Sequence, residues 1–178
     1  AVRRQRQMCI RDRFKSSKKI VLEEFLEGEE ASYFLVVDKN NYKFFGSAQD
    51  HKKVGENDTG PNTGGMGASS PAKIITKAIE KKIINKIVKP TLNALKKDGY
   101  PYKGFLYVGL MIKNNEPYLI EYNVRLGDPE CQAILARIET DLVDICIAVQ
   151  NKTLKKINII QSKQITSCVV IATRNYPE

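Results

Sequence analysis

The chain has 178 residues, of which 42% are hydrophobic and 28% charged, and these proportions exclude an intrinsically disordered protein. No uncharged apolar stretch approaches the ~18 residues that a bilayer span needs, so a membrane-spanning helix is excluded as well. The four cysteines lie far apart without a C-x-x-C pair, which argues against a zinc ribbon and a disulfide scaffold. We therefore expect a cytoplasmic protein, either one compact domain or a piece of a larger enzyme.

The net charge of +9 is concentrated at the start of the chain. Residues 1–19 carry +7 and residues 20–178 only +2, which is typical of a solvated basic tail. The stretch RRQRQMCIRDR also resembles translated sequencing-adapter read-through. We predict that residues 1–17 are a non-native or disordered tail that takes no part in the fold.

The first part of the body has the pattern of strands. Residues 20–26, 31–37 and 42–48 are rich in β-branched and aromatic side chains, and Asp38–Asn41 predicts a turn. The polar, glycine-rich stretch 49–71 shows little hydrophobic periodicity. We predict a long loop there, and loops of this length inside a domain are usually functional or disordered.

The second part mixes helices and strands. Isoleucine at every fourth position predicts a helix from Lys73 to Lys97, with a kink or break at Pro90. The remaining predicted elements are a β-hairpin at 105–112 and 117–123, a helix start capped by Asp128 with Pro129 at its first turn, an apolar helix face at 134–149, and a strand at 166–172. This order predicts an α+β or α/β fold with a mostly antiparallel sheet.

The segment LIEYNVR (119–125) is a candidate site for a divalent cation. Because side chains alternate along a strand, Glu121, Asn123 and Arg125 would share one face. A carboxylate and an amide oxygen suit Mg²⁺, and the guanidinium could stabilise a transferred phosphoryl group. The alternative is the solvent-facing side of a half-buried strand.

Two further segments are weaker candidates. The loop 60–67 contains paired glycines, which let backbone N–H groups surround an anion, although a plain surface loop fits as well. The acidic segment EEFLEGEE (23–30) could contact an adenine edge and ribose hydroxyls, and a strand with a charged turn explains it equally well. His51, between Asp50 and Lys52, is a poor metal ligand candidate; anion contact and simple exposure both fit.

Taken in order, four segments point to one family: EEFLEGEEAS, QDHKKVGENDTGPNTGGMGA, GFLYVGLM and IEYNVRLGDPE. From about Lys19 to the C-terminus the chain resembles the phosphoribosylamine–glycine ligase family of ATP-grasp enzymes. The resemblance implies an α+β ATP-grasp fold, represented by its C-terminal subdomain and truncated at both ends. Residues 18–150 would belong to the ATP-grasp domain and residues 151–178 would begin a C-terminal domain.

The resemblance also implies the reaction. Glycine would attack the γ-phosphate of ATP to form glycyl phosphate, and the amine of 5-phosphoribosylamine would displace phosphate to give glycinamide ribonucleotide. The implied cofactors are ATP and either Mg²⁺ or Mn²⁺. Because the family's first ATP-grasp subdomain would precede Lys19, the chain by itself is predicted to be inactive.

Roles transfer by motif position. The resemblance implies adenine and ribose contacts from Glu23, Glu24, Phe25, Leu26 and Glu30. It implies metal binding by Glu121 and Asn123, and phosphoryl stabilisation by Arg125 as the catalytic residue. It assigns the substrates to Asp50, His51, Lys52, Asn62, Thr63, Gly64, Gly65, Met66 and Gly67.

Two alternatives stay open. The first is another ATP-grasp carboxylate–amine ligase, against which only the QDHK and GPNTGGMG segments argue. The second is a basic nucleic-acid-binding module built on the arginine tail, which predicts salt-sensitive binding that vanishes when residues 1–17 are deleted. Because the rest of the chain is nearly neutral and has no nucleic-acid-reading signature, we expect small-molecule substrates and neither a nucleic-acid nor a membrane partner.

Overall fold

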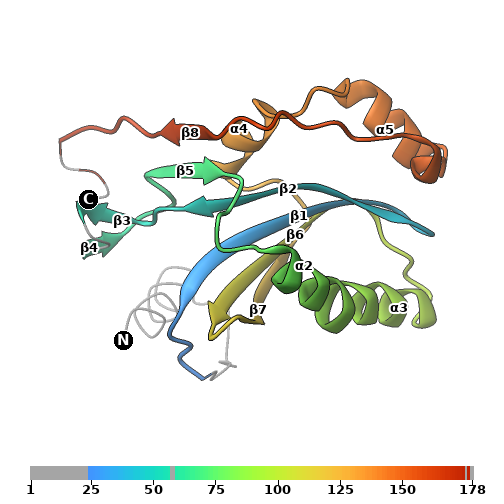
Figure 1. Ribbon diagram of the computed structural model, residues 1–178, viewed down its shortest axis with the longest axis horizontal. Coiled ribbons are helices and arrows are strands. Elements are labelled where there is room, and N and C mark those ends of the chain that lie inside the picture. The colour runs from blue at the N-terminus through green and yellow to red at the C-terminus, as the bar shows by residue number, and fades with distance from the viewer. Residues whose placement is uncertain (1–23, 57–58, 175, 177–178) are drawn as a thin grey trace, which may run out of the picture.

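The computed structural model describes residues 24–56, 59–174 and 176, and in them an antiparallel sheet carries helices on both faces (Figure 1). The strands of the sheet follow the order β7-β6-β1-β2-β5-β8. Their bounds are β1 Glu29–Asp38, β2 Tyr42–Asp50, β5 Gly67–Ser70, β6 Lys103–Lys113, β7 Glu116–Asn123 and β8 Thr166–Val169, with a separate hairpin of β3 (Lys53–Gly55) and β4 (Thr59–Asn62). This architecture confirms the predicted mixed fold with a mostly antiparallel sheet.

Helices cover the two faces of the sheet in separate groups (Figure 1). One group is a continuous stretch of α2 (Lys77–Ile83), the π-helical turn η2 (Ile84–Val88) and α3 (Lys89–Lys97). The other group contains α4 (Glu130–Leu135), α5 (Leu142–Gln150) and the short 3-10 helix η3 (Leu154–Lys156).

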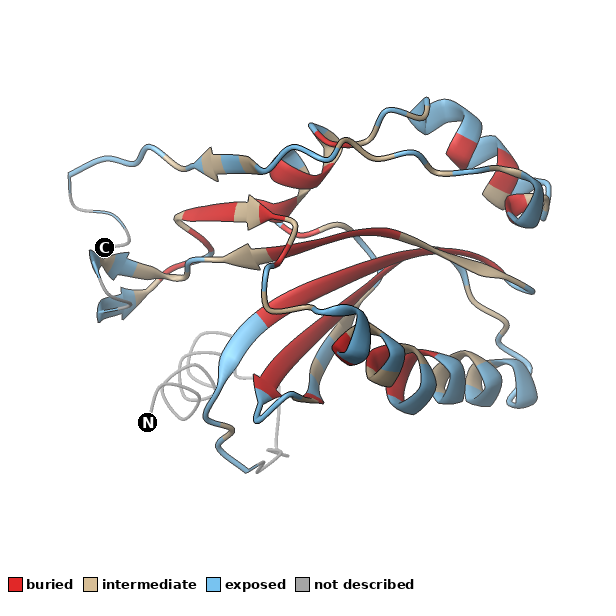
Figure 2. Ribbon diagram, viewed as in Figure 1, coloured by how far each residue is buried: buried red, intermediate tan, exposed pale blue. Residues whose placement is uncertain are grey.

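The core follows from the alternation of side chains along β1, which is buried on both faces (Figure 2). Tyr33 and Leu35 belong to an apolar cluster that includes Ile83 of α2. Phe34 belongs to a second cluster that includes Ile145 of α5. One central strand therefore supplies both cores and holds the two helical layers apart.

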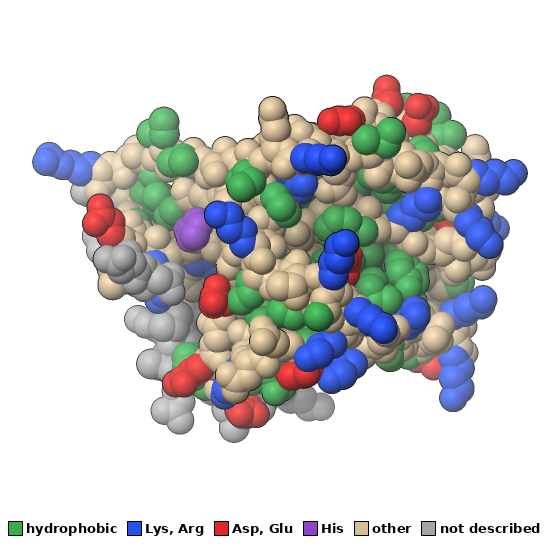
Figure 3. All heavy atoms as spheres, viewed as in Figure 1, with side chains coloured by type: hydrophobic (Ala, Val, Ile, Leu, Met, Phe, Trp, Pro, Cys, Tyr) green, Lys and Arg blue, Asp and Glu red, His purple; other side chains and the backbone are tan. Residues whose placement is uncertain are grey.

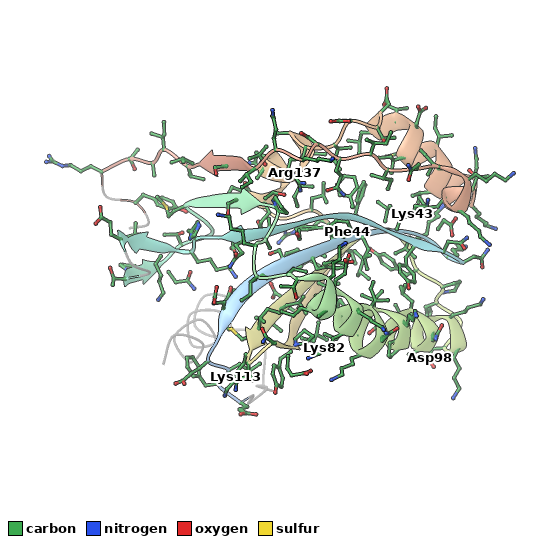
Figure 4. The ribbon with its side chains drawn as sticks, viewed as in Figure 1. Lys43, Phe44, Lys82, Asp98, Lys113 and Arg137 are labelled. Atoms are coloured by element: carbon green, nitrogen blue, oxygen red, sulfur yellow. The ribbon has the colours of Figure 1, made fainter. Side chains whose placement is uncertain are left out.

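The turns predicted next to the strands are present. The backbone N–H of Asp38 donates to the Asn41 carbonyl, which closes the β1–β2 turn. The β6–β7 hairpin turns at Asn114 and Asn115, which both have positive φ, the conformation that two-residue hairpin loops require. Lys82, labelled in Figure 4, donates to the Asn115 carbonyl at 2.9 Å and ties α2 to this turn.

The predicted strand at 20–26 is not found in its described part. Residues 20–23 lie outside the described residues, and 24–27 have no regular structure before β1 begins at Glu29. Glu29 pairs with Ile112, one residue before the end of β6. β6 therefore has almost no residues left with which 20–28 could pair. Apolar composition predicts a strand, but a strand also needs a neighbouring strand to bond with.

The stretch 49–71, predicted as one long loop, is interrupted by short strands. This stretch contains the end of β2, the β3–β4 hairpin and β5. β5 pairs with β2 through Gln49 and Asp50 and with β8 on its other side. The signal was missed because these short strands have only three or four residues, mostly glycine and polar ones, and so show no hydrophobic periodicity.

Pro90 does not break the helix. The π-helical turn precedes it, and the N–H of Lys89 donates to the carbonyl of Ile84, five residues earlier. The irregularity therefore takes the form of a widened turn, and the helix continues to Lys97.

The elements after Asn123 differ in detail from the prediction. α4 begins after Pro129, but the Asp128 carboxylate accepts a hydrogen bond from the Gln132 side chain and does not cap a backbone N–H. The single apolar helix face divides into α4 and α5, because Asp141 caps a new helix start at the Val143 N–H. The last strand is shorter than expected and ends at Val169.

A buried arginine attaches the segment before β8 to the body. Arg137 is 8% exposed and donates to the carbonyls of Ser162 and Gln164 at 2.8 and 2.9 Å, and to the Ser70 hydroxyl at 3.3 Å (Figure 4).

The division of the chain at residue 150 into two domains stays a prediction.

Candidate functional site

A small hollow opens where four strands of the sheet lie side by side. One row of paired residues crosses the sheet there: Ala48 of β2, Ser32 of β1, Gly109 of β6 and Glu121 of β7. The hollow is lined by side chains on and next to this row: Glu30, Ala31, Ser32, Asp50, Lys52, Tyr107, Gly109, Leu110, Ile120 and Glu121. The hollow thus joins four residues that the family resemblance implicates, Glu30, Asp50, Lys52 and Glu121.

Lys52 lies between two carboxylates in this hollow. Its ammonium is 2.5 Å from Oε2 of Glu30 and 3.7 Å from Oδ2 of Asp50. Burial alone would lower the pKa of Lys52, but the Asp50 charge and the hydrogen bond to Glu30 hold it above its ordinary value. The lysine therefore stays charged.

For Asp50, in contrast, burial outweighs the effect of the neighbouring charge on the pKa. Its side chain is only 4% exposed, and this burial raises the pKa of the carboxyl to about 6, against the attraction of Lys52 and with the repulsion of Glu130 and Glu30. A carboxyl that titrates near neutral pH in a hollow is typical of a functional site.

A buried hydrogen-bond chain that the sequence did not predict lies under the hollow. The Ser32 hydroxyl is 3.2 Å from the Tyr107 hydroxyl and 3.0 Å from Oε1 of Glu130. Glu130 is 3% exposed, and a side chain at Gly127 would lie 2.4 Å from its carboxylate. In the sequence, the only sign of this hydrogen-bond chain was the glutamate of the GDPE segment. Its burial against β1 could not be predicted, because it results from the tertiary fold.

Glu121 and Asn123 converge as the alternation of the strand predicts. Nδ2 of Asn123 donates to Oε1 of Glu121 at 3.3 Å. Arg125 lies two residues beyond the end of β7, where alternation no longer applies, and its guanidinium donates to the Leu126 carbonyl at 2.9 Å. The structure thus joins the first two residues, and Arg125 makes no hydrogen bond or ion pair with either of them.

The glycine loop folds back along the end of β2. The N–H of Thr63 donates to the Lys52 carbonyl, Met66 donates to His51, and His51 donates to Gly67. Gly65 has φ +142°, and a side chain there would lie 2.5 Å from the ring of Pro129. Positive φ and this close approach both require glycine, so the loop packs against the GDPE segment.

The other predicted substrate residues of this region differ in exposure. His51, the one histidine of the sequence, is exposed and visible on the surface in Figure 3. Gly64 is exposed as well. Asn62 is half-buried, and its Oδ1 is enclosed without a hydrogen-bond partner among the described residues. An enclosed acceptor of this kind is the type of atom that a ligand satisfies.

The predicted adenine-contacting segment lies apart from the hollow, except for Glu30. Glu24 and Phe25 are exposed, Phe25 at 64%, and Leu26 is half-buried. Glu23 lies outside the described residues. Of the nucleotide-binding set, therefore, only Glu30 is placed among the other candidate residues.

None of the helices among the described residues is long and apolar enough to cross a membrane. Within the same residues, no group of three His, Cys, Asp or Glu side chains is arranged to hold a metal ion. A cation here would have to rely on mixed carboxylate and amide ligands, as Glu121 and Asn123 offer.

Comparisons with known proteins show which family the chain belongs to. A family model of the phosphoribosylglycinamide synthetase ATP-grasp (A) domain matches residues 1–131. Phosphoribosylamine–glycine ligases from Vibrio parahaemolyticus and Vigna unguiculata are 46% and 48% identical over 163 and 161 residues, which are 91% and 89% of this chain. The crystal structure of the phosphoribosylamine–glycine ligase from Thermotoga maritima matches 99% of this chain with a TM-score of 0.81 and 35% identity.

The chain is shorter than these relatives. It spans 38% and 52% of the two sequences and 44% of the Thermotoga maritima chain. The residues that the family model matches nevertheless include the glycine loop and all residues that line the hollow. The chain belongs to the phosphoribosylglycinamide synthetase family, and the family model places residues 1–131 in its ATP-grasp (A) domain.

Proposed function

We propose that this chain is part of a cytoplasmic ligase that joins glycine to 5-phosphoribosylamine at the expense of ATP. The observation that carries the proposal is the hollow where Glu30, Asp50, Lys52 and Glu121 meet. The names of the relatives that are 46% and 48% identical support the choice of substrates. The reaction would pass through glycyl phosphate and yield glycinamide ribonucleotide, ADP and phosphate.

Glu121 and Asn123 fit a divalent cation. Their mutual hydrogen bond uses one carboxylate oxygen and the amide nitrogen. The second carboxylate oxygen and the amide oxygen are the hard donors that Mg²⁺ or Mn²⁺ prefers, with phosphate oxygens and waters completing the shell. A bound ion would supply neutralisation of the charge on the ATP phosphates.

The other residues would bind and orient. Glu30 would receive the ribose hydroxyls, next to Glu23–Leu26 at the adenine. Lys52 is charged and half-buried, which suits a substrate phosphate or carboxylate. The backbone of Asn62–Gly67 would surround a second anionic group, and the exposed Arg125 would stabilise the transferring phosphoryl group.

The test is glycine-dependent ADP release by the full-length enzyme that contains this chain, with phosphoribosylamine as the amine. Arg125→Ala and Glu121→Gln are each expected to lower kcat by about 10²-fold or more, the usual cost of losing a group that stabilises transition-state charge. Glu139→Gln, exposed and outside the hollow, is the matched control and should leave kcat unchanged.

Two outcomes would contradict the proposal. Equal turnover with other acids and amines would favour a different carboxylate–amine ligase. Full activity of both variants would show that neither Glu121 nor Arg125 takes part in the reaction.

The 178-residue chain alone is predicted to release no ADP.

A further inference from the structure

Tyr107 and Gly109 face the two proposed metal ligands across the β6–β7 pair. Tyr107 pairs with Asn123 and Gly109 pairs with Glu121, and paired side chains on one face of a sheet are neighbours. A side chain at Gly109 would lie 3.0 Å from a ring carbon of Tyr107 and 3.1 Å from Cγ of Glu121. The tyrosine ring and the glutamate stem therefore occupy the space that a residue other than glycine would fill.

The Tyr107 side chain is itself firmly held. It is 6% exposed, and its ring packs edge-to-face on Phe34 with centroids 5.1 Å apart. Its hydroxyl is bonded to Ser32, and Ser32 to the buried Glu130. Burial raises the pKa of Tyr107 to about 12, so the hydroxyl keeps its proton at physiological pH.

The two ligands, in contrast, have little support of their own. Glu121 is exposed, and the one side-chain hydrogen bond described for it is the 3.3 Å contact with Asn123. Exposed side chains of this kind have several accessible rotamers, and ordering them costs free energy. A rigid surface beside them lowers that cost.

We propose that Tyr107 is a positioning residue for Glu121 and Asn123, and that Gly109 keeps open the space between the Tyr107 ring and the Glu121 stem. The inference rests on the proposed function, because it assumes that these two residues bind the cation. The chain Tyr107–Ser32–Glu130 links this surface to β1 and α4.

The experiment measures Mn²⁺ binding by electron paramagnetic resonance in the full-length enzyme with ADP present, without turnover. Gly109→Ala and Tyr107→Leu are each expected to weaken Mn²⁺ affinity about tenfold, the lower end of the usual cost of removing an outer-shell partner. Tyr107→Phe is expected to recover most of the affinity, because its ring can still pack on Phe34.

Gly46→Ala is the matched control for overcrowding. A side chain there would lie 2.6 Å from Cγ2 of Ile134, in the core cluster with Phe34 and away from Glu121. It should lower the melting temperature at least as much as Gly109→Ala and leave Mn²⁺ affinity unchanged.

Unchanged Mn²⁺ affinity in Gly109→Ala and Tyr107→Leu would overturn the proposal, as would an equal loss in Gly46→Ala. If Gly109→Ala does not fold, the Tyr107→Leu and Tyr107→Phe pair decides alone. Mn²⁺ binding that depends on Glu121 but without glycine-dependent ADP release would refute the proposed reaction and leave this inference standing.

Discussion

The two ends of the β1–β2 pair each carry a buried aspartate, and the two behave in opposite ways. Asp38 lies at the turn and Asp50 at the far end of β2, with 0% of the Asp38 residue and 4% of the Asp50 side chain exposed. Burial alone would raise the pKa of Asp38, but bonds from the N–H groups of Asn40, Asn41 and Leu154 hold it below its ordinary value. Burial raises the pKa of Asp50 to about 6, because Lys52 at 3.7 Å only partly compensates.

This difference separates a structural carboxylate from a candidate functional one. The carboxylate oxygens of Asp38 accept hydrogen bonds from backbone N–H groups of the protein, and the bond from Leu154 joins the turn to η3. The Asp50 side chain lines the hollow, where the Lys52 ammonium lies 3.7 Å away, and its carboxylate is placed to meet a ligand. The comparison predicts that substitutions at the two ends will affect different properties.

The largest expected effect is on stability at the turn. Asp38→Ala should lower the free energy of unfolding by about 3 kcal/mol, because it leaves buried N–H groups without an acceptor. Because folding lowers the pKa of Asp38, its carboxylate stabilises the folded wild type above about pH 4. This stabilisation is lost as the pH falls and the carboxylate is protonated, so the difference between the wild type and Asp38→Ala should shrink at low pH. Urea denaturation at pH 7 and at pH 3 measures both; a loss no larger than that of the exposed control Asp144→Ala would contradict the role of Asp38.

The next effect is the pH dependence of stability that Asp50 causes at the end of β2. Between the unfolded pKa of about 4 and the folded pKa of about 6, the folded protein binds more protons at Asp50, so stability falls as the pH rises. Relative to Asp50→Asn, the wild type should lose roughly 2 kcal/mol between pH 4 and pH 7. Denaturation curves at four pH values give this difference, and a constant offset between the two proteins would show that Asp50 titrates normally.

The smallest effect concerns the glycine loop next to the Asp50 end of β2. Thr63 donates its hydroxyl to the Lys52 carbonyl at 2.9 Å and accepts the Gly65 N–H at 3.0 Å. Thr63→Val keeps the shape and should cost about 1 kcal/mol, seen as faster hydrogen exchange of the 63–67 amides. Thr59→Val, whose hydroxyl bonds the Glu56 carbonyl at the tip of the hairpin, should leave those amides unchanged; equal acceleration by both variants would mean that Thr63 has no special role.

The sequence predicted best where the information is local. The alternation of β7 was enough to place Glu121 beside Asn123, and it failed for Arg125 because the strand ends first. Backbone pairing in the glycine-rich region left no hydrophobic pattern, so β3, β4 and β5 went undetected. The wrong cap at Asp128 has a similar cause, since its carboxylate found a side-chain partner in Gln132.

What the amino-acid order determined alone was the kind of fold, the family, and the chemical types gathered at the site, because hydrophobic periodicity and motif spacing are properties of neighbours along the chain. Only the tertiary structure decided that Glu30, Lys52 and Glu121 line one hollow and that Glu130 is buried beneath it. The strand register brings Glu30 and Glu121 to the same hollow, and the packing of α4 against β1 buries Glu130. The contacts Lys52–Glu30 and Ser32–Glu130 join residues 22 and 98 positions apart, which no local pattern records.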